Sequence, residues 1–300
     1  MPTASNAEFI VANLEFDTIK SNLKAYLSSQ DYFSDYNFDG SNMNVLLDVL
    51  SYNTYYNNIY LNHVASEMFL DSAQVRDSVY SHAKKLNYLP TSYRSSVAYA
   101  NVQITPDDSP HSIDIPRLTK FTTTVGDNTY TFSTNTAVTA YSNTSYLAAN
   151  VALYEGEIVT EFYETNSTSN TFFINNYDVD TTSITVKVRA SNTDTTNSEW
   201  TRANTLFDIS GTSNVFFVQA AANGSYELVF GNDTFGRKLT DGNIVEATYR
   251  VPSGSEPDGA NSFTSAGAIS GYSTVAATVV ERASGGKEYQ SLDDIKFSAP

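Results

Sequence analysis

A long run without glycine or proline, from Asn42 to Leu89, constrains the fold of this chain most. Ser41 or Asn42 can cap a helix at its start, because a side-chain oxygen there accepts hydrogen bonds from the free amides of the first turn. Apolar and aromatic residues then recur mostly three or four apart, which is typical of one helix face. This stripe comprises Val45, Leu46, Val49, Leu50, Asn53, Tyr56, Tyr60, Val64 and Phe69. The spacing predicts a long helix.

The same helix carries large apolar side chains on a second flank, where tyrosines adjoin Leu61 and Met68. A helix that is apolar on more than one flank must be covered on more than one flank, by its own domain or by another chain. An ordinary buried core helix is the alternative interpretation. We hypothesise that four residues of this flank pack between chains. They are Tyr52, Tyr56, Tyr60 and Leu61.

A second helix is predicted to begin at Asp71 or Ser72 and to end near Asn87, which suits a left-handed terminator. Pro90 prevents the helix from restarting. Its apolar residues again recur at intervals of three and four residues. Lysines occupy its last turn, where the helix dipole favours cations. A further helical face lies between residues 14 and 27. We therefore predict a helical N-terminal region over residues 1–95.

The apolar period changes from about four to two at Ser95, which favours β-strands. Short runs rich in Val, Thr, Phe and Tyr then alternate with glycine and asparagine turns, as in antiparallel sheets. The predicted fold class is α+β, with an N-terminal helical arm followed by mainly antiparallel β domains. We divide the remainder into a β-rich region at 96–196, a second at 197–282, and the start of a further segment at 283–300.

Three stretches carry a family resemblance. NFDGSNMNVLLDVLSYNTYYNNIYLNHVASEMFLDSA and RDSVYSHAKKLNYLPTSYRSSVA resemble the N-terminal region of the baseplate wedge protein of contractile-tailed myophages. YELVFGNDTFGRKLTDGNIVEATYR resembles the strand, glycine loop, Lys-Leu, Gly-Asn and strand pattern of the wider baseplate J-like family. The end, SGGKEYQSLDDIKFSAP, resembles the start of that family's next segment, and we expect the chain to correspond to the N-terminal part of such a protein.

The resemblance implies a structural subunit of a phage tail baseplate wedge, located in the virion and assembled in the host cytoplasm. It implies that two copies of the chain join a larger wedge protein through a shared helix bundle. It further implies that wedges close into a ring around the central hub, next to other wedge, hub and sheath-proximal proteins, and rearrange when the sheath contracts.

Charge and composition disfavour several other partners. The net charge of −16 repels phosphate backbones and anionic lipid heads, so we expect no nucleic acid and no membrane as partner. The sequence lacks a run of about 18 apolar residues that a membrane helix needs, and shows no basic and apolar leader. Without cysteine, it offers no disulfide framework and no thiolate metal site.

No motif predicts catalysis or a cofactor, so we assign no catalytic, cofactor-binding or metal-binding residue. A nucleophile triad needs a histidine base beside Ser or Cys, but His63 and His82 lie in the helical region and His111 in a proline-rich turn. The run from Gly231 to Gly236 differs from a phosphate loop, because arginine and lysine follow it without a Ser or Thr. A tail-associated glycan-binding or depolymerase β protein stays the alternative function.

One partial motif concerns calcium. Asp35, Asn37 and Asp39 followed by Gly40 match the first half of a calcium loop. Leu46 stands where the closing bidentate glutamate belongs. We therefore favour a turn whose side-chain oxygens cap backbone amides.

Overall fold

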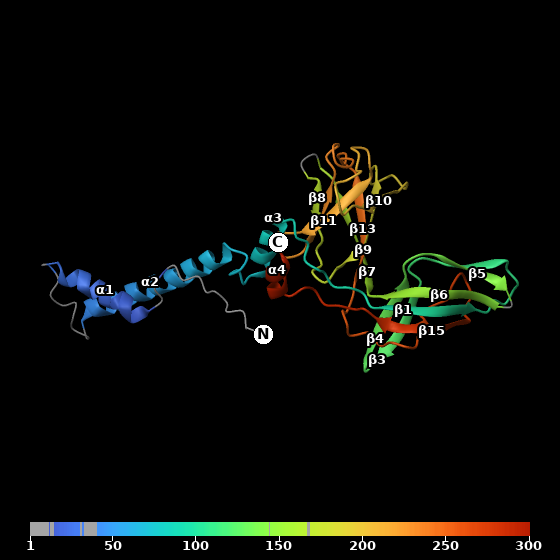
Figure 1. Ribbon diagram of the computed structural model, residues 1–300, viewed down its shortest axis with the longest axis horizontal. Coiled ribbons are helices and arrows are strands. Elements are labelled where there is room, and N and C mark those ends of the chain that lie inside the picture. Colours follow the sequence, from blue (N-terminus) through green and yellow to red (C-terminus); the bar gives the residue numbers. More distant parts are fainter. Residues whose placement is uncertain (1–11, 13–14, 31, 33–40, 144, 167–168) are drawn as a thin grey trace.

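The computed structural model describes residues 12, 15–30, 32, 41–143, 145–166 and 169–300. Figure 1 shows an extended helical arm that leads through a short helical junction to two β lobes. Helices precede two sheets in which nearly all neighbouring strands run antiparallel. The predicted α+β class is confirmed.

The arm consists of α1 (Phe16–Ser28) and α2 (Asn42–Glu67), which lie side by side. Ser41 caps α2 as predicted, since its hydroxyl oxygen accepts a hydrogen bond from the Asn44 amide at 3.1 Å. Phe16, at the start of α1, contacts Tyr52 in the middle of α2. Lys20, one turn later in α1, pairs with Asp48, one turn earlier in α2, so the two helices run antiparallel. The first part of the long uninterrupted run therefore forms a helix that projects from the rest of the molecule.

The second predicted helix, α3 (Arg76–Lys85), begins later than the predicted Asp71 or Ser72. The Glu67 carboxylate accepts the amide hydrogens of Gln74 and Val75, which holds the preceding residues in a turn. The end of the helix is as predicted, because Asn87 adopts a positive φ of 55°.

One lobe is built on a sheet of eight described strands, and we call it the eight-stranded lobe. Its main path is β14–β3–β4–β6–β1–β15, and β2 and β5 extend it beside β6. The strands are β1 (Val97–Ile104), β2 (Ser112–Ile115), β3 (Lys120–Val125), β4 (Asn128–Thr134), β5 (Val138–Asn143), β6 (Ser145–Glu155), β14 (Thr264–Ser265) and β15 (Val275–Ser284).

The other lobe, the seven-stranded lobe, has the strand order β7–β13–β9–β10–β11–β12–β8 among its described strands. Only the β10–β11 pair in this order is parallel. The strands are β7 (Glu157–Glu164), β8 (Thr171–Phe173), β9 (Asp180–Arg189), β10 (Ser198–Arg202), β11 (Val215–Ala220), β12 (Tyr226–Phe230) and β13 (Ile244–Val251).

The sheets are not divided at residue 196, where the sequence placed a boundary. That position falls between β9 and β10, which pair antiparallel within one sheet. The eight-stranded lobe instead combines residues 97–155 with β14 and β15 from near the end of the chain. Its strand β1 pairs with both β6 and β15, so distant segments close the lobe.

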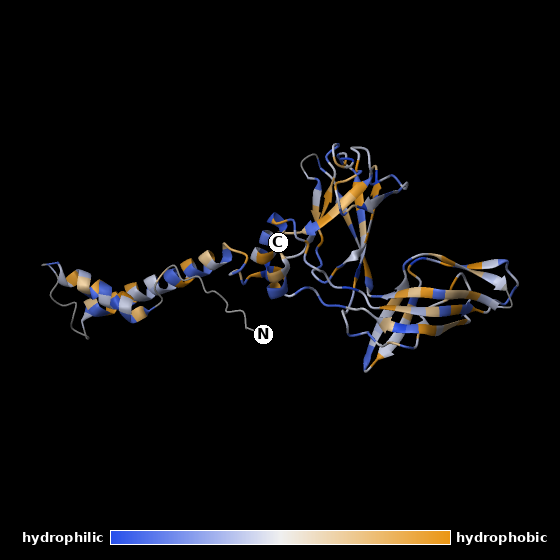
Figure 2. Cartoon of the chain, in the orientation of Figure 1, coloured by the Kyte–Doolittle hydropathy of each residue, from blue (hydrophilic) through white to orange (hydrophobic). Residues whose placement is uncertain are grey.

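Each lobe has its own apolar core, as the alternation of apolar and polar residues along the strands indicates (Figure 2). The core of the seven-stranded lobe also takes in Val79 and Tyr80 of α3 and Ile295 of α4 (Leu292–Ser298), all completely buried. Helix α3 therefore belongs to this lobe by packing, although it follows α2 in the chain. The arm itself contributes no described residue to either apolar cluster.

Candidate functional site

The long helix α2 is unusual in which of its side chains are exposed. Nine of its large apolar and aromatic residues are 49–65% exposed in the single chain, and they recur along the length of the helix. They are Val45, Leu46, Val49, Leu50, Tyr52, Tyr56, Tyr60, Leu61 and Val64. We call this set the α2 face.

The buried residues of α2 are mostly polar. Leu47 is the one apolar residue among them, and the others are Asn44, Ser51, Asn62 and Ser66. A helix that packs only within its own chain buries its apolar stripe and exposes its polar side. The pattern in α2 is the reverse, so the α2 face is a candidate surface for other polypeptides.

Helix α1 covers α2 only in part. Lys20 forms an ion pair with Asp48 at 2.5 Å, and the Phe16 ring lies 5.1 Å from the Tyr52 ring between centroids. No residue of α1 is itself buried. The two-helix pair therefore hides little apolar surface, and the α2 face stays accessible beside it.

The four residues predicted to pack between chains all lie on the α2 face. Tyr52, Tyr56 and Tyr60 follow one another at intervals of four and so share one side of the helix. The rings of Tyr52 and Tyr56 are in contact, with 5.8 Å between centroids. Tyr60 and Leu61 are 65% and 49% exposed. Their interchain role stays a prediction.

Sequence reasoning underestimated the extent of this surface. Val45, Leu46, Val49 and Leu50 belong to the first apolar stripe, yet they are as exposed as the tyrosines. Periodicity identified their shared face but did not show whether the chain itself covers it. The near absence of buried apolar side chains in α2 is a property that only the three-dimensional packing reveals.

The arm is held at its base by Glu67, the last residue of α2. Its carboxylate accepts hydrogen bonds from the amides of Gln74 at 2.8 Å and Val75 at 3.3 Å. The Glu67 carbonyl oxygen also lies 2.9 Å from Nε2 of His82. Partial burial raises the pKa of Glu67, but the hydrogen bonds from the Gln74 amide, the Ser78 side chain and the Val75 amide outweigh it, so the pKa is lowered overall.

Helix α3 is in turn fixed to the seven-stranded lobe. Lys84 pairs with Glu227 on β12, and Arg76 donates a hydrogen bond to the Gly224 carbonyl oxygen at 2.7 Å. The Arg76 guanidinium lies 4.8 Å from the Tyr80 ring centroid and 4.6 Å from that of Tyr289. These contacts give the arm a firm base, so the α2 face projects at a defined place.

The described part of the chain offers little for other kinds of site. Within it, no group of three or more His, Asp or Glu residues is placed to hold a metal ion. None of its helices combines the length and apolar character required to cross a membrane. The candidate calcium ligands Asp35, Asn37 and Asp39 lie outside the described residues.

Comparison with known proteins bears directly on the arm. Residues 15–88 match the family model of the gp6-like baseplate wedge protein, helical domain. This match covers α1, α2 and α3, and therefore the whole α2 face.

A relative extends the similarity beyond the helices. The baseplate wedge protein gp6 of Enterobacteria phage T4 is 29% identical over 296 residues, which covers 91% of this chain. The chain spans 43% of the length of that relative. The family match and this relative thus both name a baseplate wedge protein.

A solved structure also resembles the chain weakly. The cryo-EM structure of the anti-feeding prophage baseplate matches with a TM-score of 0.33 at 9% identity, over 97% of this chain and 60% of that one. A similarity at this level carries no argument about fold or function.

Proposed function

We propose that this chain is a structural subunit of a phage tail baseplate wedge and that the α2 face joins it to other chains. The observation that carries the proposal is the reversed burial of α2, whose apolar residues are exposed while polar ones are buried. The family match over the same helices and the likeness to the T4 wedge protein support it.

The partners of the α2 face are a second copy of this chain and a larger baseplate wedge protein, joined in a helix bundle. Tyrosine suits such contacts, because each ring buries a large area and its hydroxyl tolerates water trapped at the interface. The spacing of Tyr52, Tyr56 and Tyr60 presents one continuous aromatic row to a neighbouring helix. Other wedge, hub and sheath-proximal proteins contact the assembled ring, which forms in the host cytoplasm, is carried in the virion and rearranges on sheath contraction.

Membership in the wider baseplate J-like family is part of the same proposal. The residues that carry this resemblance form β12 and β13, joined by the loop from Gly231 to Asn243. Gly236 and Gly242 in this loop have φ values of +83° and +81°, which only glycine adopts without strain. The glycines of the resemblance thus stand where the backbone requires them.

The role requires no chemical step by this chain, and the proposed function is not enzymatic. His82 contacts the backbone carbonyl oxygen of Glu67 through Nε2, which is a structural contact at the base of the arm. The work of the chain is to hold neighbours at fixed positions.

Co-expression with the other wedge proteins of the same phage tests the proposal. The double variant Tyr56→Ala/Tyr60→Ala is expected to reduce co-purification strongly, because truncating one interface aromatic commonly costs about 2 kcal/mol or more. The matched control, Tyr141→Ala/Phe207→Ala, removes two exposed aromatic rings from the β lobes. Unchanged recovery of the double variant, with the sheet circular dichroism preserved, would contradict the proposal.

A further inference from the structure

The two β lobes meet at a junction that is unlike either of their cores. Strand β6 of the eight-stranded lobe ends at Glu155, and β7 of the seven-stranded lobe begins at Glu157. One residue, Gly156, therefore connects the lobes at this point. Its φ is +123°, and a Cβ placed there would lie 3.0 Å from the Val251 carbonyl oxygen. Only glycine fits this crossing without strain.

No apolar residue belongs to both cores, so the lobes are not joined by a shared apolar cluster of described residues. An interface between domains that is neither large nor apolar allows the domains to move relative to each other. The contacts across this junction are instead made by buried polar and charged side chains.

Arg250, on β13 of the seven-stranded lobe, is 2% exposed and reaches into the eight-stranded lobe. It donates hydrogen bonds to the Ser133 hydroxyl at 2.5 Å and to the Tyr154 carbonyl oxygen at 3.3 Å. It also reaches the carbonyl oxygens of Ser133 and Thr134, each at 3.4 Å. These acceptors are neutral oxygens, and burial is the largest cause that lowers the pKa of Arg250 to about 10.

Arg117, between β2 and β3, also donates a hydrogen bond across the junction to the Thr185 hydroxyl on β9 at 3.2 Å. Two buried carboxylates make further contacts. Glu155, at the end of the eight-stranded lobe, accepts hydrogen bonds from the Ser253 amide and hydroxyl, each at 3.0 Å. Asp180, on β9 of the other lobe, accepts from the amide and hydroxyl of Ser95 at 3.1 and 2.9 Å. Ser253 lies just after β13 of the seven-stranded lobe, and Ser95 lies just before β1 of the eight-stranded lobe. Each carboxylate therefore accepts hydrogen bonds from a residue that adjoins the opposite lobe. The angle between the lobes is thus held by charge-assisted hydrogen bonds.

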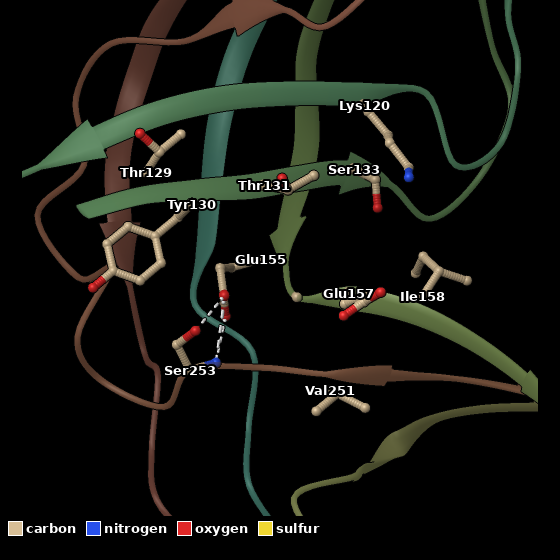
Figure 3. A pocket seen from close by; sticks show the side chains of 11 residues that line it. Lys120, Thr129, Tyr130, Thr131, Ser133, Glu155, Glu157, Ile158, Val251 and Ser253 are labelled. Carbon is tan, nitrogen blue, oxygen red and sulfur yellow. Dashed lines mark hydrogen bonds between the residues drawn. The ribbon is translucent and has the colours of Figure 1, made fainter.

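A cavity of about 350 Å³ opens beside Gly156 and separates the lobes on that side (Figure 3). Lys120 and Ser133 of the eight-stranded lobe line one wall, and Glu157 and Ile158 of β7 line the other. Lys120 and Glu157 place opposite charges on the two walls, while Glu155 adds a second carboxylate at the end of β6, and the space between the walls is not filled by side chains. Rotation about Gly156 toward this cavity would therefore meet little steric resistance and would bring Lys120 toward Glu157.

We propose that Gly156 is a hinge between the two β lobes and that Arg250 is the latch that holds them at the observed angle. Releasing the latch breaks hydrogen bonds that water can replace, while both apolar cores stay intact. The lobes then rotate as rigid bodies into the cavity. This inference concerns the β lobes alone and stands independently of the α2 face.

Distance measurements between spin labels test the hinge in the full chain. The sequence has no cysteine, so Asp127→Cys on the eight-stranded lobe and Asn192→Cys on the seven-stranded lobe allow specific labelling at two exposed sites. With Arg250 intact, we expect one narrow distance distribution. With Arg250→Met added, we expect the distribution to broaden and its mean to shift, while circular dichroism shows both sheets folded.

A second variant keeps the test decisive if Arg250→Met does not fold. Arg250→Lys retains the positive charge but cannot reach several acceptors at once, so we expect a smaller broadening in the same direction. Lys120→Glu places like charges on the two walls of the cavity. Added to Arg250→Met or to Arg250→Lys, it should reduce the shift in the mean distance between the spin labels. A folded Arg250 variant with the distance distribution of the parent chain would overturn the proposal.

Discussion

Lys84 on α3 and Glu227 on β12 form an ion pair that joins the helical junction to the seven-stranded lobe. The Glu227 side chain is 2% exposed, whereas that of Lys84 is 36% exposed. Gln219 on β11 donates a further hydrogen bond to the same carboxylate oxygen. A carboxylate buried this deeply depends on its partners, because an unpaired buried charge is costly.

Removing Lys84 should therefore destabilise the chain more than its partly exposed position suggests. For Lys84→Met we expect the free energy of unfolding to fall by about 3 kcal/mol, since Glu227 stays buried without its cation. Urea denaturation followed by circular dichroism measures the change. The neighbouring Lys85→Met, at an exposed position of the same turn, should cost at most about 0.5 kcal/mol.

Replacing both members of the pair separates the cost of a lone charge from the value of the pair. In Lys84→Met/Glu227→Met we expect most of the lost stability to return, because a buried pair can often be exchanged for apolar side chains without net loss. A double variant as unstable as Lys84→Met would contradict this explanation.

The Arg76 stack predicts how the C-terminal segment is held. The guanidinium lies close to the rings of both Tyr80 and Tyr289, and its planar shape allows contact with both. For Arg76→Lys we expect the free energy of unfolding to fall by about 1 kcal/mol. We also expect faster amide hydrogen exchange around Tyr289. Arg282→Lys, at an exposed position on β15, is the matched control and should leave both measurements unchanged.

The pKa of Glu67 predicts a dependence of stability on pH. Its folded-state pKa is lowered, so the folded chain binds fewer protons at this site than the unfolded chain. The stabilisation is fully present above the ordinary carboxyl pKa of about 4.3 and is lost as the pH falls through the lowered folded-state value.

Comparison of Glu67→Gln with the parent chain isolates this contribution. We expect the variant to be less stable by about 1 kcal/mol at neutral pH, because a neutral amide caps Gln74 and Val75 more weakly. The difference in urea midpoint should shrink as the pH is lowered into the acidic range. If the difference in urea midpoint between Glu67→Gln and the parent chain did not change with pH, the lowered pKa of Glu67 would not be its cause. The same would hold if the control Asp71→Asn, at an exposed position, showed an equal difference.

Local structure could largely be predicted from the sequence. The strands at Val97–Ile104, Tyr226–Phe230 and Ile244–Val251 follow directly from a period of two bounded by turn residues. The Ser41 cap and the positive φ of Asn87 follow from the local chemistry of those side chains. These features depend on neighbouring residues, which is why the sequence reveals them.

The arrangement of the sheets could not be predicted in this way. Strand β1 pairs with β15, and this pairing joins Val97 to Ser284. Spacing along the chain gives no information on such a distant pairing, so the predicted division at residue 196 cuts through one sheet. The start of α3 was missed for a related reason, because the Glu67 carboxylate reaches forward to Gln74 and replaces the expected cap.

The candidate site was predicted in part. Apolar residues on two flanks of one helix indicated that α2 needs more cover than a helix pair supplies, and the structure shows the exposed apolar row. The polar buried residues Asn44, Ser51 and Asn62 carry no signal in the sequence, since polar residues are ordinarily expected on the exposed side. Arg250 was missed because its acceptors, the Ser133 hydroxyl and several backbone oxygens, lie far away along the chain.

Photocrosslinking from Tyr60 in assembled baseplates tests the central claim most directly. With p-benzoylphenylalanine at Tyr60, irradiation is expected to join this chain covalently to another polypeptide, because the α2 face packs between chains. The same replacement at Tyr141, which is equally exposed on the eight-stranded lobe, measures contacts made by an exposed tyrosine outside the arm. Abundant interchain products from Tyr60 are predicted, and assembled particles in which Tyr60 gives no interchain product would contradict the account.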